Sequence, residues 1–230
     1  MFYTDCLDEK FNTQDIRIQF LDIETEIGQT FAYATEAANR INMMTIYDTY
    51  TDKYYTWSLS HAKIEFHDEC DEDGNVVWKN PLKDYPKDKF VFFEFNDDEE
   101  ELLRHYISWT EDNYPDIVCG WNVKLFDMPY IVRRIENVLG KSHAQRLSPV
   151  GKYRIKEINH DNPREKGSGD IEVDLSGVFI ADDLVLYRDK FLIAPALDGG
   201  YGLSNVGEHE ELGKKIQYKG SLKDLYVKNY

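Results

Sequence analysis

The chain has 230 residues, which suits one large domain or one domain with a small appendage, and 42% of its residues are apolar. No run approaches the roughly 18 consecutive apolar residues of a membrane helix, and the acidic N-terminus has no apolar signal region, so we expect neither a membrane protein nor an exported one. The formal net charge of −16 argues against a nucleic-acid-binding protein that contacts phosphates through basic side chains. Carboxylates that hold divalent cations would weaken that objection, because a metal reverses the local charge.

The three cysteines, Cys6, Cys70 and Cys119, form no CxxC pair. An odd number of unclustered cysteines is typical of reduced thiols rather than of a disulfide framework. We therefore expect a cytoplasmic protein.

Alternating or continuous apolar residues predict five strands along the chain. These strands occupy residues 16–25, 41–50, 53–60, 90–95 and 116–122. Between the third and the fourth strand, the polar stretch 61–89 contains a DEDGN core and predicts a turn or a disordered loop.

Residues 96–113 predict a helix that Asn96 or Asp97 can cap, with an apolar stripe along one side. The acidic residues 97–101 at its start are most simply explained as a solvated helix N-terminus. A second helix is expected over 127–140, with Gly140 as its C-cap. Two alternating runs within 148–180 predict a β-hairpin, and further helices are expected around 181–190 and 203–210. This order of elements predicts an α/β fold, a mixed sheet with helices on both faces.

The stretch FLDIET places Asp22 and Glu24 two residues apart at the end of the first predicted strand. Side chains two apart on a strand share a face, so the two carboxylates project together. They repel each other unless a cation lies between them, and carboxylate oxygens suit Mg²⁺ or Mn²⁺. The pattern by itself is common, and two solvated acids at a strand end explain it as well.

A second group of candidate residues follows the strand 116–122. In GWNVKLFDMPYI, Asn122 and Asp127 are five apart, and Phe126 precedes the acid. Asp127 alone could simply cap the helix that begins there. The combination of Asn, Phe and Asp after a buried strand, about a hundred residues beyond the DIE motif, is a rarer pattern and favours a shared site.

DIET followed by GWNVKLFDMPYI resembles the first two exonuclease motifs of family B DNA polymerases. YIVRRIENVLG, RLSPVGKYRIK, the LVLYRDKF run and LSNVGEHEELGKKIQYKG are similar to the proofreading domain of T-even-type phage polymerases, so the resemblance runs from about residue 3 to the end. It implies an RNase H-like (DnaQ-like) exonuclease domain over 16–230, with an inserted hairpin at 148–180 and a remnant of an N-terminal region at 1–15. The implied activity is 3′→5′ hydrolysis of the terminal phosphodiester of a primer strand with two Mg²⁺ or Mn²⁺ ions, in the host cytoplasm if a phage encodes the protein.

The same resemblance gives each candidate residue a role. Asp22 resembles the acid that bridges both metals, Glu24 the acid that binds one metal and orients the attacking water, and Asp127 the acid that holds the second metal. The residues expected near the last nucleotides of the single-stranded 3′ end are Asn122, Phe126 and Thr25. The hairpin resembles one that faces DNA, rather than an ordinary solvated loop, and its expected phosphate contacts are Lys152, Arg154 and Lys156.

Family members normally carry a third motif, Tyr-x-x-x-Asp or His-x-x-x-x-Asp, and no Tyr or His of this sequence is followed by Asp at that spacing. The polymerase motifs are absent as well. We therefore expect a C-terminally incomplete exonuclease domain, from a fragment or a split gene, with weak metal binding and little or no nuclease activity alone. The expected partners are the 3′ end of a DNA primer, a polymerase domain in the same or a split chain, and a sliding clamp reached through the missing part.

Two other functions fit the same residues. The first is a non-catalytic DNA-binding or scaffold module of a split polymerase, which the lack of the third motif favours. The second is a free-standing RNase H-like nuclease that acts on RNA, against which the long hairpin and the polymerase-like C-terminal region argue.

Overall fold

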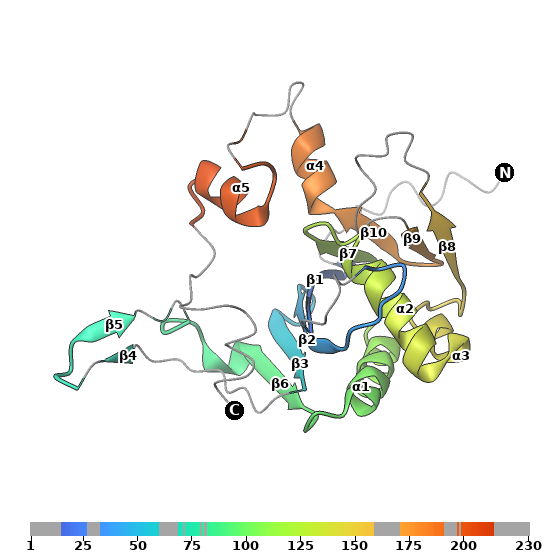
Figure 1. Cartoon of the computed structure of the whole chain (residues 1–230), viewed down its shortest axis with the longest axis horizontal. Helices are drawn as coiled ribbons and strands as arrows, with labels where there is room; N and C mark the ends of the chain where they lie inside the picture. Colours follow the sequence, from blue (N-terminus) through green and yellow to red (C-terminus); the bar gives the residue numbers. More distant parts are fainter. Residues whose placement is uncertain are drawn as a thin grey trace.

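The structure is a computed structural model of the chain, and it describes residues 15–26, 33–59, 69–70, 72–78, 80, 82–158, 171–190, 197 and 199–213. The strands of its central sheet are β1 (Ile18–Thr25), β2 (Ile41–Asp48), β3 (Lys53–Ser58), β6 (Phe90–Glu94), β7 (Ile117–Gly120) and β10 (Phe179–Asp182). They lie in the order β10-β7-β1-β2-β3-β6 (Figure 1). The five strands predicted from the sequence are confirmed, with shifts of a few residues at their ends.

The sheet is mixed because β1 joins two kinds of pairing. On one side β1 pairs with β2 antiparallel, and on the other side it pairs with β7 parallel. Burial alternates along β1, with Leu21 and Ile23 in the core and Phe20 and Asp22 exposed. The alternation follows from the period-two geometry of a strand, and it places the acids of the DIE motif on the face away from the apolar core.

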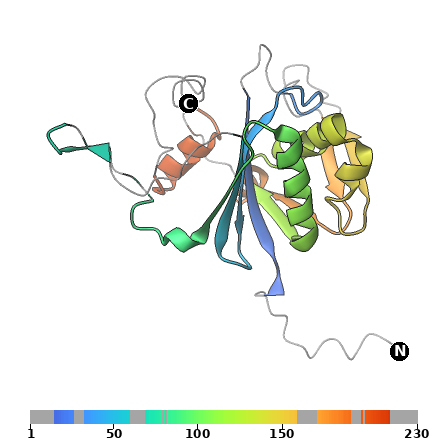
Figure 2. The same ribbon diagram turned by 90° about the horizontal axis from the view of Figure 1, so that it is seen from below.

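Helices cover both faces of the sheet, as the element order predicts (Figure 2). The helices α1 (Glu99–Asp112), α2 (Asp127–Leu139) and α3 (Lys141–Gln145) lie on one face, and α5 (Leu203–His209) lies on the other. Gly140 ends α2 with a φ of 90°, which a residue with a side chain adopts only with strain. Of the helices in the described part of the chain, none is both long and apolar enough to cross a membrane.

In the C-terminal third, the hairpin predicted within 148–180 is shorter than expected, and the two predicted helices are confirmed. The hairpin consists of β8 (Tyr153–Glu157) and β9 (Ile171–Leu175) in a separate two-stranded sheet, and residues 159–170 of the chain lie outside the described residues. The residues after it form β10 of the main sheet, because the chain turns at Gly177 and the following apolar run pairs with β7. The helix expected around 181–190 is confirmed as α4 (Asp183–Asp189), and the helix expected around 203–210 is confirmed as α5.

Of the polar stretch 61–89, residues 61–68, 71, 79 and 81 lie outside the described residues. Its described parts include the short antiparallel pair β4 (Glu69–Cys70) and β5 (Val76–Trp78), followed by the 3-10 turn η2 (Lys87–Lys89). Glu72 and Asp73 form a turn between the two short strands, which confirms the turn predicted at DEDGN.

The acidic start of α1 is not simply the solvated run that the sequence predicted. Asp98 is the N-cap, and not Asn96 or Asp97, since its side chain accepts a hydrogen bond from Glu101 N at 3.0 Å. The next residue, Glu99, is only 7% exposed. The predicted solvated run is confirmed at Asp97, Asp98, Glu100 and Glu101, which are exposed, and it is wrong only for Glu99, whose side chain faces α2.

Glu99 forms a buried ion pair with Arg134 of α2. Its Oε1 accepts from Arg134 Nε at 2.9 Å and from the backbone N–H of Ile41 at 2.7 Å, and its Oε2 accepts from Arg134 Nη2 at 2.6 Å. Arg134 Nη1 donates to the carbonyl oxygens of Ala37 and Ala38. These bonds join α1, α2 and the beginning of β2 at one point.

A second buried ion pair lies at the other end of β2. Asp48 is fully buried, and its Oδ2 accepts from Arg17 Nε at 2.8 Å and also from Arg17 Nη2. Arg17 Nη2 donates to Asn113 Oδ1 after the end of α1. The two pairs fix the ends of β2 against α1 and α2, and so fix the position of α2 relative to the sheet.

Replacing Glu99 with Ala tests the first of these pairs. The change leaves the guanidinium of Arg134 and the N–H of Ile41 buried without their acceptor, so the free energy of unfolding should fall by about 3–5 kcal/mol. The matched control is Glu100→Ala, which removes the exposed i,i+4 pair with Arg104 and should change the free energy by about 0.5 kcal/mol or less. Urea denaturation of the three proteins measures both effects, and equal losses would contradict the assignment of Glu99.

Candidate active site

The acids of the DIE motif lie together at the end of β1. Asp22 is exposed and Glu24 is half-buried. Leu21 before them and Ile23 between them are in the core. The register between β1 and β2 shifts between Glu24 and Thr25, so the strand is irregular where the acids end. The structure thus places Asp22 and Glu24 on one face, as the sequence predicts, with Thr25 directly after them.

Asp127 reaches the same place from the first turn of α2. Its side chain is turned to β1, where Oδ1 accepts a hydrogen bond from the backbone N–H of Ile23 at 3.1 Å. The N-cap position belongs to Phe126, which has no side-chain cap, so Asp127 does not serve as the helix cap considered above. The bond to Ile23 holds the Asp127 carboxylate against the backbone between the two acids of β1.

The surroundings of Asp127 oppose a bare negative charge. The pKa of Asp127 is raised from its ordinary value of 3.8 to about 7, chiefly by burial and then by the charge of Asp22, while the hydrogen bond from Ile23 N opposes the shift. Asp182 adds a smaller repulsion. A divalent cation would remove this penalty, and the carboxylate oxygens present are the donors that Mg²⁺ and Mn²⁺ prefer. Within the described residues, however, no three or more His, Cys, Asp or Glu side chains are already grouped as a metal site.

The turn at residues 121–126 carries the remaining residues of the second motif. Asn122 has a φ of 66°, a left-handed backbone conformation in which Asn is more frequent than most residues. Its carbonyl oxygen accepts from Leu125 N and Phe126 N, and the ring of Phe126 lies 5.5 Å from that of Tyr130. Asn122 and Phe126 therefore lie on the turn that leads into Asp127.

The strand before this turn approaches β1 unusually closely. A Cβ atom added to Gly120 would lie 2.5 Å from the carbonyl oxygen of Leu21, next to the acid pair. Only glycine fits there without movement of one of the two strands. The spacing of β7 and β1, and with it the distance from the turn to the DIE motif, depends on this residue.

Sequence reasoning missed Asp182, at the end of β10. It is 5% exposed and caps α4, and its carboxylate also accepts hydrogen bonds from the backbone of the 121–126 turn. The signal was present in FIADDL, where an apolar strand runs into an Asp before a helix, a typical N-cap pattern. The sequence could not show that this cap also lies beside Asp127.

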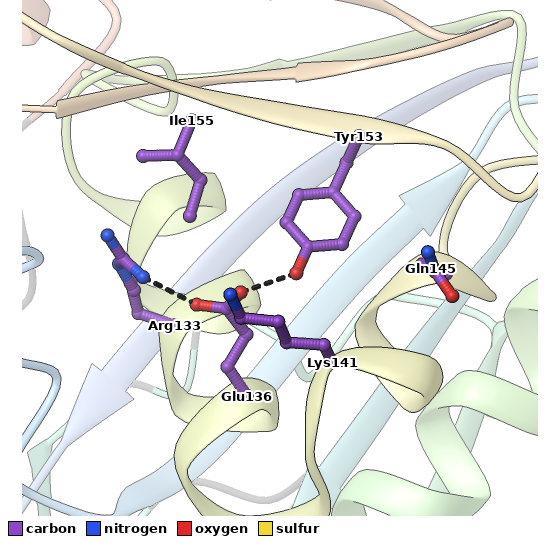
Figure 3. A pocket seen from close by; sticks show the side chains of 6 residues that line it. All are labelled: Arg133, Glu136, Lys141, Gln145, Tyr153 and Ile155. Carbon is purple, nitrogen blue, oxygen red and sulfur yellow. Dashed lines mark hydrogen bonds and ion pairs between the residues drawn. The ribbon is translucent and has the colours of Figure 1, made fainter.

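The hairpin is joined to α2 by partly buried polar contacts around a surface pocket of about 360 Å³ (Figure 3). The hydroxyl of Tyr153 on β8 donates to Glu136 Oε1, and Arg133 Nη1 donates to Glu136 Oε2 at 2.7 Å. Burial raises the pKa of Tyr153, which keeps its hydroxyl protonated as a donor. The base of the hairpin is thus fixed to the helix that begins at Asp127.

The basic residues of the hairpin are less available than their sequence suggests. Arg154 and Lys156 both form ion pairs with Asp174 of β9, at 2.9 and 3.4 Å, whereas Lys152 is exposed. Exposed pairs of this kind are weak, so a phosphate could replace Asp174 as a partner. Their role in DNA binding stays a prediction.

Comparison with known proteins identifies the family. A family model for the exonuclease domain of family B DNA polymerases matches residues 4–206. This chain belongs to that family. The mixed sheet with flanking helices agrees with the RNase H-like fold of such exonuclease domains, which confirms the fold expected from the sequence.

Two phage enzymes are similar to this exonuclease domain over almost its whole length. It is 31% identical over 230 residues to the DNA-directed DNA polymerase of Escherichia phage RB69, a match that covers 96% of this chain and 24% of that protein. It is 31% identical over 234 residues to the DNA-directed DNA polymerase of Enterobacteria phage T4, covering 97% of this chain and 24% of the relative. A shorter match, 30% identical over 86 residues, covers 36% of this chain and 8% of a guinea pig cytomegalovirus DNA polymerase. The chain thus spans about a quarter of the length of its phage relatives.

Replacing Asp127 with Asn tests the electrostatic strain in this site. Because the folded chain raises the pKa of Asp127 to about 7, it binds this proton more tightly than the unfolded chain does, and stability is lost as the pH rises from about 4 to about 7. Asn keeps the acceptor for Ile23 N and carries no charge. In EDTA, Asp127→Asn should be more stable than the unchanged chain at pH 8, by up to a few kcal/mol, and nearly equal to it at pH 4.

Thermal and urea unfolding across this pH range measure the effect, with the exposed Asp84→Asn as the control that should show no such trend. Added Mn²⁺ should raise the stability of the unchanged chain and should not raise the stability of Asp127→Asn. A stability difference that does not depend on pH would contradict the assignment.

Proposed function

We propose that this chain is the 3′→5′ exonuclease domain of a phage-type replicative DNA polymerase, which removes the terminal nucleotide of a primer strand during proofreading. Membership of the exonuclease family supports the reaction class. The observation that carries the site is the hydrogen bond from Ile23 N to Asp127 Oδ1, because it joins the two separate motifs at one point.

The residues that would hold two Mg²⁺ or Mn²⁺ ions are Asp22, Glu24 and Asp127. The donor set fits such ions, because it consists of carboxylate oxygens and because burial and the charge of Asp22 raise the pKa of Asp127, a penalty that a bound cation would relieve. When bound, the ions would lower the pKa of a water and stabilise negative charge on the phosphate. The chain itself supplies the oxygens and the fixed positions, and the reaction requires no nucleophilic side chain.

The remaining roles concern the DNA. Asn122 and Phe126 lie on the turn beside the acids, where an unpaired 3′ end could contact them, and Thr25 follows the acid pair on β1. An unpaired base can stack on an aromatic ring, which favours a frayed primer over a duplex. We infer from the resemblance that the hairpin, through Lys152, Arg154 and Lys156, faces this DNA. A polymerase domain and a sliding clamp are the proposed protein partners.

A non-catalytic module is the second candidate function. It is favoured by the sequence, because no Tyr-x-x-x-Asp or His-x-x-x-x-Asp occurs in the 230 residues. Such a module would bind DNA or a polymerase domain with the same fold and would not need a complete set of acids. The two candidates differ in metal-dependent cleavage and not in DNA binding.

An exonuclease assay separates these functions. With a 5′-labelled single-stranded DNA and Mn²⁺, we expect slow shortening from the 3′ end by the unchanged chain, and loss of that activity in Asp22→Asn. DNA binding, measured by fluorescence anisotropy in EDTA, should remain in the variant. Binding without any cleavage would favour the non-catalytic module, and preferential cleavage of the matching RNA would favour an RNA nuclease.

The rate itself tests the expectation that the site is incomplete. Rapid Mg²⁺-dependent degradation that Asp22→Asn abolishes would show that the acids within these 230 residues are sufficient. Cleavage that Asp22→Asn leaves unchanged would remove Asp22 from the site.

A further inference from the structure

Asp182 occupies an unusual position for a helix cap. It is the last residue of β10, opposite Gly120 in the parallel register with β7, and its side chain is 5% exposed. Its Oδ1 accepts from Leu184 N at 3.0 Å and from Val185 N at 3.4 Å, which satisfies the free backbone donors at the start of α4. These two bonds are what a capping side chain provides.

The same carboxylate makes two further hydrogen bonds that a cap does not need. Asn122 N donates to Oδ1 at 3.3 Å, and Lys124 N donates to Oδ2 at 3.1 Å. Both donors belong to the 121–126 turn, about sixty residues away along the chain. Asp182 therefore ties the start of α4 to the turn that leads into Asp127.

An aspartate at position 182 is informative because its negative charge is electrostatically unfavourable beside Asp127. The charge of Asp182 adds to the repulsion that raises the pKa of Asp127, and a neutral Ser, Thr or Asn would cap α4 about as well. Only a carboxylate, however, presents two acceptor oxygens, with room for four N–H donors from two segments. The structure accepts a buried negative charge beside the acidic site, which indicates that the second oxygen is required there.

The turn that Asp182 holds determines where Asp127 lies. Val123 in the middle of the turn is fully buried, and its carbonyl oxygen accepts from Met128 N at 3.0 Å in the first turn of α2. Asn122 has its left-handed backbone conformation next to the bond from its N–H to Asp182. A change in this turn would therefore move the start of α2, and Asp127 with it, relative to Ile23.

We propose that Asp182 is a positioning residue for the acidic site: by accepting hydrogen bonds from Asn122 N and Lys124 N, it fixes the 121–126 turn and so holds Asp127 where it can bind a divalent cation together with the acids of β1. The proposal rests on the proposed function. Asp182 itself is not a metal ligand in this proposal, because its two oxygens already accept four backbone hydrogen bonds.

The test uses the 230-residue chain and the variants Asp182→Asn and Asp182→Ala. Asp182→Asn keeps one acceptor oxygen for the cap of α4 and loses the second, while Asp182→Ala loses both. The matched control is Asp98→Asn, which alters the cap of α1 at Glu101 N and does not touch the turn. Mn²⁺ affinity is measured by electron paramagnetic resonance, and amide hydrogen exchange at Asn122 and Lys124 is measured by NMR.

We expect the Mn²⁺ dissociation constant of folded Asp182→Asn to rise by about 10- to 100-fold, the usual effect of losing a group that orients a metal ligand. Amide exchange at Lys124 should become faster in the same variant. Asp98→Asn should change stability little, because Asn caps a helix about as well as Asp, and it should keep the Mn²⁺ affinity and the exchange rates of the 121–126 turn. Asp182→Ala should show the same changes more strongly, and if it does not fold, Asp182→Asn alone decides.

A purely structural cap would give another result. If Asp182→Asn lowers the melting temperature but leaves both the Mn²⁺ affinity and the exchange of Lys124 unchanged, the proposal is overturned. If the unchanged chain binds no Mn²⁺, the proposed function fails instead. In that case exchange at Asn122 and Lys124 still shows whether Asp182 holds the turn.

Discussion

The architecture of this chain depends on bringing carboxylates together against their mutual repulsion. Asp127 is buried, its pKa is raised to about 7, and Asp22 and Asp182 both act against its charge. A single hydrogen bond from Ile23 N holds it beside the acids of β1. One such bond contributes about 1 kcal/mol net, less than the electrostatic penalty that the pKa reports. The acids must therefore be held by the surrounding fold, and a bound cation would relieve the strain that the fold maintains.

Several buried polar contacts provide that support. The Glu99–Arg134 pair joins α1 to α2, and the Arg17–Asp48 pair fixes the far end of β2. Glu136 of α2 holds the base of the hairpin through Tyr153. Because α2 carries Asp127 at its first residue, each contact that fixes this helix also limits the movement of Asp127. The site is thus positioned by charged groups that lie well away from it.

The sequence predicted the parts of this design that local patterns encode. Alternation along β1 predicted that Asp22 and Glu24 share a face, and the apolar stripe over 96–113 predicted α1. Sequence reasoning failed where an outcome depends on a distant partner. Glu99 was expected in solvent because no local pattern indicates its ion pair with Arg134. Asp182 was missed because the N–H groups that it binds, those of Asn122 and Lys124, are about sixty residues away along the chain. That Asp127 contacts Ile23 could be expected from the resemblance, but not from propensity.

Gly120 has a consequence for how this protein can change over generations. The space for a side chain there is taken by the carbonyl oxygen of Leu21, at 2.5 Å from where a Cβ atom would be. At this position even a methyl group would force two backbones apart directly beneath the acids. Residue 120 is therefore restricted to glycine for as long as β7 and β1 keep this spacing.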